Sequence, residues 1–156
     1  SDEAAQILGE KAREYNIALS VHAPYFTNIS SVEPEKIDNT INYILQSATA
    51  AHNMGAKRLV VHMGAAKDIT RRYAMEISKT TIQRALNELD NAGLSDVALC
   101  METMGKINQM GTIEEVMEIC KIDDRLLPTI DFGHLNARTL GGLKTYDNFL
   151  EIFDTI

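Results

Sequence analysis

The chain repeats one pattern, in which a short apolar run is followed by a longer stretch with the residue spacing of a helix. The apolar runs are rich in Val, Leu and Ile and are nearly continuous, as expected for strands buried on both faces. Strands of this kind that alternate with helices form parallel β-α-β units. The pattern therefore predicts an α/β fold with a parallel sheet.

Glycine, proline and capping residues mark the boundaries of the units. Pro34 is suited to a first helical turn, Gly55 and Gly93 end helices, and Thr112 opens a capping box with Glu115. The predicted strands cover residues 17–22, 58–62, 97–102 and 127–131, and the predicted helices cover residues 1–15, 34–54, 68–92, 112–120 and 146–156. No linker interrupts the pattern, so residues 1–156 are expected to form a single domain.

Composition and charge narrow the function classes. The formal net charge of −7 counts against broad, nonspecific attraction to nucleic acid, although bound divalent cations would reverse the field locally. No apolar run reaches the roughly 20 residues needed to span a bilayer, and the acidic first residues lack the features of a signal peptide. We therefore expect a cytoplasmic protein without a membrane partner. Cys100 and Cys120 form no C-x-x-C pair, and we interpret them as reduced thiols.

Each of the four predicted strands ends in a residue that is able to bind a metal. The four residues are spaced by about one β-α unit, and they are His22, His62, Glu102 and Asp131. In a parallel barrel the C-terminal ends of the strands meet at one rim, where such folds keep their chemistry. We therefore expect the four side chains to meet, with His134, three residues after Asp131, as a further candidate.

Structural roles are an alternative for each of these residues taken alone. A histidine after a strand is more often a hydrogen-bonded structural group, and a carboxylate there often caps a helix. The complete set favours a metal site, because imidazole nitrogen and carboxylate oxygen suit zinc, manganese or iron. Glu102 has two carboxylate oxygens and is able to bridge two ions. We interpret His52, inside a helical pattern, as a surface or packing residue.

The motifs resemble those of endonuclease IV, the metal-dependent apurinic/apyrimidinic endonucleases of DNA base excision repair. The resemblance runs from the H-x-P-Y segment at His22 to the D-x-x-H segment at Asp131, through Val60-Val61-His62-Met63-Gly64 and Met101-Glu102-Thr103. It implies a TIM (β/α)8 barrel that cleaves the DNA phosphodiester at abasic sites with up to three zinc ions. This chain departs from the family in having Glu102-Thr103-Met104-Gly105 for the usual E-N-T-A-G, and Phe132 and Gly133 after Asp131.

The resemblance also implies a role for each site residue. His22, His62 and Glu102 would bind the first ion, with Glu102 as a catalytic group that bridges to a second ion. Asp131 would bind the second ion and His134 the third. Tyr25 and Phe26 match residues of a loop that penetrates DNA containing an abasic site, although loop packing is the alternative for this pair.

A complete barrel needs eight strands and about 250 residues, whereas this chain supplies four strands. We therefore expect a partial barrel, the central part of a longer protein, in which further ligands of the second and third ions lie outside these residues. The two outer strands would expose unpaired backbone edges, which favours self-association.

Two other functions remain open. Sugar isomerases and epimerases share this barrel superfamily and usually need one divalent ion, whereas two histidines on successive early strands favour the nuclease. A binding module, or an inactive fragment, is the third possibility. Several basic residues follow strands and are interpreted either as solvated charges or as phosphate contacts, namely Lys67, Arg71, Arg72, Lys106 and Arg138.

Overall fold

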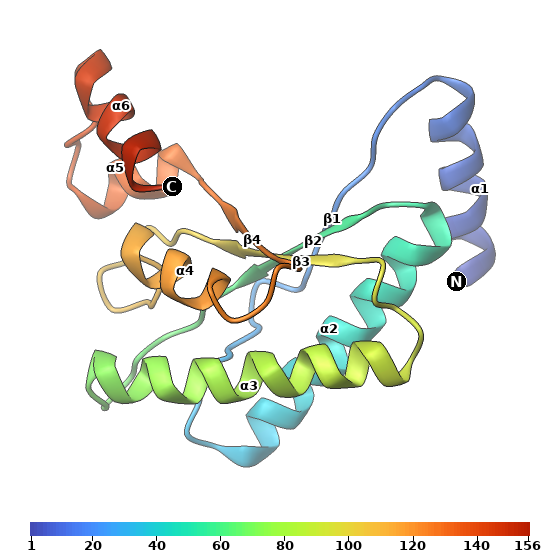
Figure 1. Cartoon of the computed structure of the whole chain (residues 1–156), viewed down its shortest axis with the longest axis horizontal. Helices are drawn as coiled ribbons and strands as arrows, with labels where there is room; N and C mark the ends of the chain where they lie inside the picture. Colours follow the sequence, from blue (N-terminus) through green and yellow to red (C-terminus); the bar gives the residue numbers. More distant parts are fainter.

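The centre of the molecule is one sheet of four parallel strands, seen in a computed structural model that describes all 156 residues. The strands are Val21–His22 (β1), Arg58–His62 (β2), Ala98–Glu102 (β3) and Leu126–Thr129 (β4). Their order across the sheet is their order along the chain, and a helix joins each strand to the next (Figure 1). The α/β class with four β-α units is therefore confirmed.

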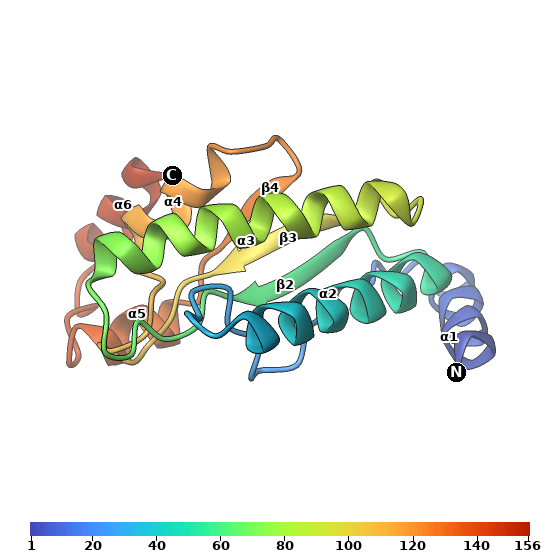
Figure 2. The same cartoon turned by 90° about the horizontal axis from the view of Figure 1, so that it is seen from below.

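Six helices accompany the sheet: α1 (Asp2–Glu14), α2 (Pro34–Met54), α3 (Arg71–Asn91), α4 (Ile113–Cys120), α5 (Phe132–Arg138) and α6 (Tyr146–Thr155). α2 and α3 lie side by side along one face of the sheet (Figure 2), and α4 contacts β3 and β4. α1 and the pair α5 and α6 lie at opposite ends of the molecule (Figure 1). None of the helices combines the length and the apolar character that a membrane crossing needs.

The core lies between the sheet and its covering helices. Leu59 and Val61 on β2 are fully buried, whereas Arg58 at the start of the same strand is exposed. Ile44 of α2 and Leu86 of α3 belong to the same cluster of 24 buried residues. Burying one such side chain contributes roughly 1.5–3 kcal/mol, so the helix-facing residues fix the position of each strand.

Two of the predicted strands differ in extent from the observed ones. The prediction for residues 17–22 is wrong for residues 17–20, because β1 pairs only Val21 and His22 with β2. β1 is an edge strand, and the chain before it leads away toward α1 without a partner strand (Figure 1). β4 covers Leu126–Thr129 instead of residues 127–131, and Asp131 lies beyond its end.

Two helices also differ from the prediction. α3 begins at Arg71 and not at residue 68, because the Thr70 side chain caps it and Asp68 takes a left-handed backbone conformation with φ of 60°. α5 is absent from the predicted elements. Its seven residues include a glycine and an asparagine, which disguise the helical pattern, while its N-cap is the Asp131 side chain.

The open edges of β1 and β4 lead to a prediction about the 156-residue chain. Each of these strands has one neighbour, so its other edge presents unpaired backbone donors and acceptors. We expect the purified chain to self-associate or to unfold at low denaturant concentration. Sedimentation velocity over a concentration series, together with urea titration, measures both, and a monomer of ordinary stability would contradict the expectation.

Candidate metal centre

The C-terminal ends of β1, β2 and β3 bring two histidines onto one buried carboxylate. His62 is the register partner of Glu102 on the neighbouring strand. The Nε2 atoms of His62 and His22 lie 2.9 Å and 3.2 Å from the same Glu102 Oε2. Glu102 is only 8% exposed and His62 11%, whereas His22 is 48% exposed. Three residues far apart in sequence therefore share one site, as the strand-end pattern predicted.

Backbone carbonyl groups orient both imidazole rings. His22 donates from Nδ1 to the carbonyl oxygen of Ala23 at 2.7 Å, and His62 donates from Nδ1 to that of Tyr25 at 2.9 Å. A neutral ring that donates from Nδ1 turns the lone pair of Nε2 toward Glu102. The contact is then attractive only when Nε2 carries a proton or binds a cation. The donor set therefore fits a divalent metal, and such backbone bonds orient metal-binding histidines generally.

A second group of potential ligands shares Glu102. Ligand atoms of Glu102, Asp131 and His134 lie within 4.8 Å of one another, as do those of His22, His62 and Glu102. Glu102 Oε2 faces the first pair of histidines, and Oε1 lies 3.8 Å from His134 Nδ1. The geometry therefore allows the Glu102 carboxylate to bridge two adjacent sites.

Asp131 and His134 each use one polar atom inside the fold. Asp131 Oδ1 accepts from the backbone N–H of His134 at 2.8 Å and caps α5, which leaves Oδ2 available. His134 donates from Nδ1 to the carbonyl oxygen of Thr103 at 2.9 Å, so Nε2 is its remaining ligand atom. Asp131 therefore has the helix-capping role that the sequence left open, together with a second oxygen, Oδ2, that lies 3.5 Å from His134 Nδ1.

Opposed effects act on the pKa values of the central pair. Burial raises the pKa of Glu102, but hydrogen bonds and the charges of His62 and His22 outweigh burial, and the pKa falls below its usual range. The hydrogen bond to Glu102 raises the pKa of His62, with burial opposing it and the Tyr25 carbonyl adding to it. In the metal-free chain the two groups therefore hold each other in their charged forms.

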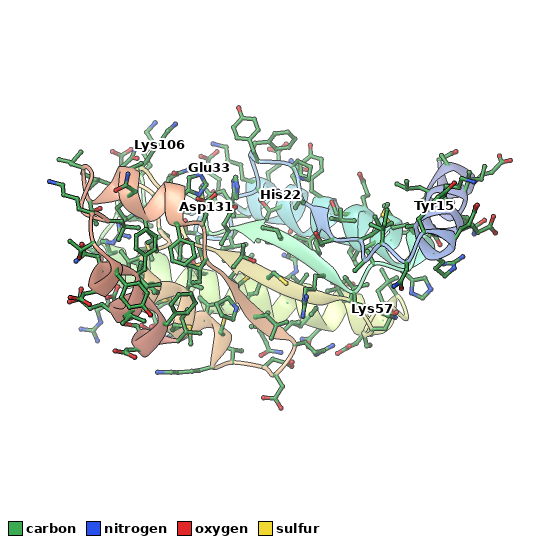
Figure 3. The ribbon with its side chains drawn as sticks, turned by 90° about the horizontal axis from the view of Figure 1, so that it is seen from above. Tyr15, His22, Glu33, Lys57, Lys106 and Asp131 are labelled. Carbon is green, nitrogen blue, oxygen red and sulfur yellow. The ribbon has the colours of Figure 1, made fainter.

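A pocket of about 520 Å³ adjoins the centre and is lined by His62, His134, Lys106 and the Tyr25–Phe26 segment, among others. Figure 3 shows Asp131 and Lys106 toward one end of the molecule, His22 near its middle, and Tyr15 at the other end. Tyr25 is 78% exposed and Phe26 56% exposed, and the Phe26 ring also packs edge-on against Tyr43 of α2. A larger pocket of about 630 Å³ is lined by residues around the opposite strand ends and contains none of the five candidate ligands.

The basic residues that follow the strands do not form one group. Arg71 and Arg138 donate to backbone carbonyl oxygens of residues 104–109, so their charges are paired within the fold, although 40% of the Arg71 side chain is still exposed. Lys67, Arg72 and Lys106 are exposed. His52 is 49% exposed and bonds Asp96, which confirms its interpretation as a surface residue. Cys100 and Cys120 are unpaired by any disulfide.

The structure adds Thr103, which sequence reasoning missed, to the residues that organise the site. Thr103 is fully buried, its hydroxyl accepts from the backbone N–H of Asp131 at 2.9 Å, and its carbonyl holds His134. The only sequence signal was its position directly after Glu102. A buried hydroxyl with such partners ties the end of β3 to the start of α5.

Replacing Thr103 by Val tests this tie. The isosteric change leaves the Asp131 N–H without an acceptor, so we expect the free energy of unfolding to fall by about 1–3 kcal/mol. Thr27→Val is a matched control, because the Thr27 hydroxyl is buried without a hydrogen-bond partner. Urea denaturation compares the two variants, and equal effects would remove the special role of Thr103.

The coupling of His62 and Glu102 predicts a pH dependence of the metal-free chain. Stability from Glu102 is present above its unfolded pKa of about 4.5 and is lost as pH falls through its lower folded value. Stability from His62 is present below its unfolded pKa of about 6.5 and is lost as pH rises through its higher folded value. The pair therefore stabilises most between these two pH values.

Titration of the imidazole ring by NMR, after dialysis against a chelator, measures the pKa of His62 directly. Glu102→Gln removes the carboxylate, and we expect the pKa of His62 to drop toward or below its ordinary value. A His62 pKa that is the same in the variant and the natural sequence would refute the coupling.

Comparison with known proteins places this geometry in a family. The family model described as "Xylose isomerase-like TIM barrel" matches residues 1–155. The uncharacterised protein MJ0133 of Methanocaldococcus jannaschii is 36% identical over 94% of this chain and 54% of its own length. A probable endonuclease 4 of Acholeplasma laidlawii is 29% identical over 99% of this chain and 53% of its own length.

Solved structures show the same fold. A D-tagatose 3-epimerase-like protein has a TM-score of 0.73 at 22% identity, covering 87% of this chain and 53% of that protein. Endonuclease IV from Thermus thermophilus has a TM-score of 0.70 at 22% identity, covering 99% of this chain and 52% of that protein. The chain thus spans about half the length of the relatives it matches, which agrees with four strands of an eight-stranded barrel. It belongs to the xylose isomerase-like TIM barrel family.

Proposed function

We propose that this chain carries the first metal site of an apurinic/apyrimidinic endonuclease, an enzyme that hydrolyses the DNA phosphodiester at abasic sites. The observation that carries the proposal is the meeting of His22 and His62 Nε2 on a single oxygen of Glu102. The relatives named probable endonuclease 4 support the DNA substrate. The epimerase-like neighbour shares the fold, so fold alone does not choose between the two activities.

The donor set supports zinc as the proposed cofactor, with manganese or iron as other ions that accept imidazole and carboxylate ligands. His22, His62 and Glu102 would hold one ion, Glu102 and Asp131 a second, and His134 Nε2 a third. Bound divalent ions would supply an activated water and stabilise charge on the phosphodiester. The chain's own contribution is to fix these donors through the carbonyl groups of Ala23, Tyr25 and Thr103.

The surface beside the centre supports a nucleic-acid substrate in two ways. Tyr25 and Phe26 expose aromatic rings at the rim of the pocket, where they could insert into a base stack and hold the duplex open at the lesion. Lys106 adds an exposed cation to the same pocket. Arg71 and Arg138 are already hydrogen-bonded to backbone carbonyl groups, which leaves few uncommitted cations beside the pocket. This suits recognition of a deformed site over nonspecific binding to the DNA backbone.

The alternative activity is isomerisation or epimerisation of a sugar at a single metal. Glu102 and Asp131 would serve that chemistry as well as nuclease chemistry. His22 and His62 argue for the nuclease, because their shared contact with Glu102 creates an imidazole-rich site beside the carboxylates. A metal-free binding module is the remaining alternative, and it would leave the two Nε2 atoms without a cation to bind.

Metal analysis of the longest natural form of the protein separates these activities. The nuclease proposal expects up to three ions per chain, the epimerase alternative expects one, and the binding module none. Elemental analysis after purification without chelator gives the number directly. A single ion that is retained when His22 and His62 are both changed to alanine would overturn the proposed first site.

Glu102→Gln tests the chemical role in the same full-length protein. Losing the bridging carboxylate should abolish nicking of a duplex with one abasic site while the far-ultraviolet circular dichroism is unchanged. His52→Gln is the matched control, because His52 lies on the exposed end of α2 and should leave cleavage unaffected. Normal cleavage by Glu102→Gln would show that the role proposed for Glu102 is wrong.

A further inference from the structure

Two arginines from different helices bind the backbone of the loop that follows β3. Arg138, the last residue of α5, donates from Nη1 to the carbonyl oxygens of Met104 at 3.0 Å and Lys106 at 2.9 Å. Its Nη2 donates to the carbonyl oxygens of Gln109 at 3.1 Å and Ile107 at 3.4 Å. Arg71, the first residue of α3, donates to the same carbonyl oxygens of Ile107 and Gln109, at 3.2 Å and 3.0 Å. The carbonyl groups of this loop therefore turn toward two guanidinium groups.

The guanidinium group of Arg71 is itself held in place by an ion pair. Glu115 of α4 accepts from Arg71 Nε and Nη2 at 2.7 Å and 2.6 Å, and it also accepts from the backbone N–H groups of Gly111 and Thr112. Burial, and after it the charge of Arg71, lowers the pKa of Arg138. Two cations in such proximity repel each other, so the convergent carbonyl dipoles are what make the arrangement favourable. Both arginines are thus hydrogen-bonded within the chain, while 40% of the Arg71 side chain remains exposed.

The bound loop packs directly on His134. A Cβ atom added to Gly105 would lie 3.3–3.4 Å from the ring and backbone of His134, which leaves little room between them. The carbonyl of Thr103, at the start of the loop, accepts from His134 Nδ1. Arg138 lies one helical turn after His134 on α5. The loop is therefore tied to α5 at two points along the helix, once at His134 and once at Arg138.

We propose that Arg138 and Arg71 are positioning residues, which fix the loop of residues 104–109 to α5 and to α3 respectively and thereby hold the His134 ring with Nε2 left for a ligand. The step from the loop to the ligand rests on the proposed function, because it takes His134 as a metal ligand. The fixing of the loop by the two arginines is independent of the proposed function. The two arginines then serve the site through the backbone, and they are not phosphate contacts.

Hydrogen exchange of the metal-free chain tests the fixing of the loop. The backbone N–H groups of Gln109 and Met110 bond the carbonyl oxygens of Lys106 and Gly64, so their exchange reports on the loop. In Arg138→Ala we expect these two amides to exchange at least about tenfold faster, while the Leu99 amide in β3 stays protected. Arg72→Ala is the matched control, because Arg72 is the exposed neighbour of Arg71.

Arg138→Lys keeps the positive charge but lacks the planar fork that reaches four carbonyl groups. It should accelerate the same amides, although less than the alanine variant does. If Arg138→Ala unfolds, the Leu99 amide will lose its protection from exchange. In that case the Arg138→Lys variant still decides the test. Unchanged exchange at Gln109 and Met110 in a folded Arg138 variant would overturn the proposal.

Zinc titration tests whether the fixed loop positions His134 as a metal ligand. We expect Arg138→Lys and a folded Arg138→Ala to weaken zinc binding at the Glu102–Asp131–His134 cluster by about 10–100-fold, the usual effect of losing a group that orients a ligand. Binding that depends on His22 and His62 should be unaffected, and so should all binding by Arg72→Ala. A loosened loop with unchanged zinc affinity would refute the positioning of His134. A natural sequence that binds no zinc would refute the proposed function, while the exchange result would still decide the fixing of the loop.

Discussion

The ionised carboxylate of Glu102, buried at the end of β3, is the interaction on which the rest of the site depends. Removing a carboxylate from water is costly unless charged or hydrogen-bonding partners compensate it. β3 is an inner strand, so its end has a neighbour on either side. His62 reaches Glu102 from β2, and the chain after β4 brings Asp131 and His134 to its other oxygen. An edge strand could not have gathered ligands from two sides.

Main-chain carbonyl groups orient all three histidines of the centre. His22, His62 and His134 each donate from Nδ1 to a carbonyl in a segment that follows a strand. Because backbone groups make these bonds, the residues at which the chain departs from the endonuclease IV pattern do not remove them. Phe132 turns to an aromatic contact with Phe149 and Phe153 of α6, and Met104 is buried beside Gly111. Neither Phe132 nor Met104 supplies one of the carbonyl groups that orient the histidine rings, because those belong to Ala23, Tyr25 and Thr103.

The alternation of strands and helices followed from the sequence because it depends on local composition. Apolar runs at 58–62 and 97–102 had the character of buried strands, and proline, glycine and capping residues bounded the helices close to their observed ends. Failures occurred where a tertiary partner decides the structure. Residues 17–20 have strand composition but no neighbouring strand, and α5 exists because the Asp131 side chain turns back to cap it. Local composition predicts neither the missing neighbour strand nor the capping contact.

The sequence by itself determined which residues stand at or just after the strand ends, and hence that His22, His62, Glu102 and Asp131 would share one rim of a parallel sheet. Periodicity and strand polarity suffice for that result, since parallel strands put their C-terminal ends on one side. Only the tertiary structure decided which atoms meet, because hydrogen bonds between distant segments set the ring orientations and the role of Thr103. It also decided that Arg71 and Arg138 donate to backbone carbonyl groups of one loop. A sequence shows which residues are charged, but tertiary packing decides which groups those charges contact.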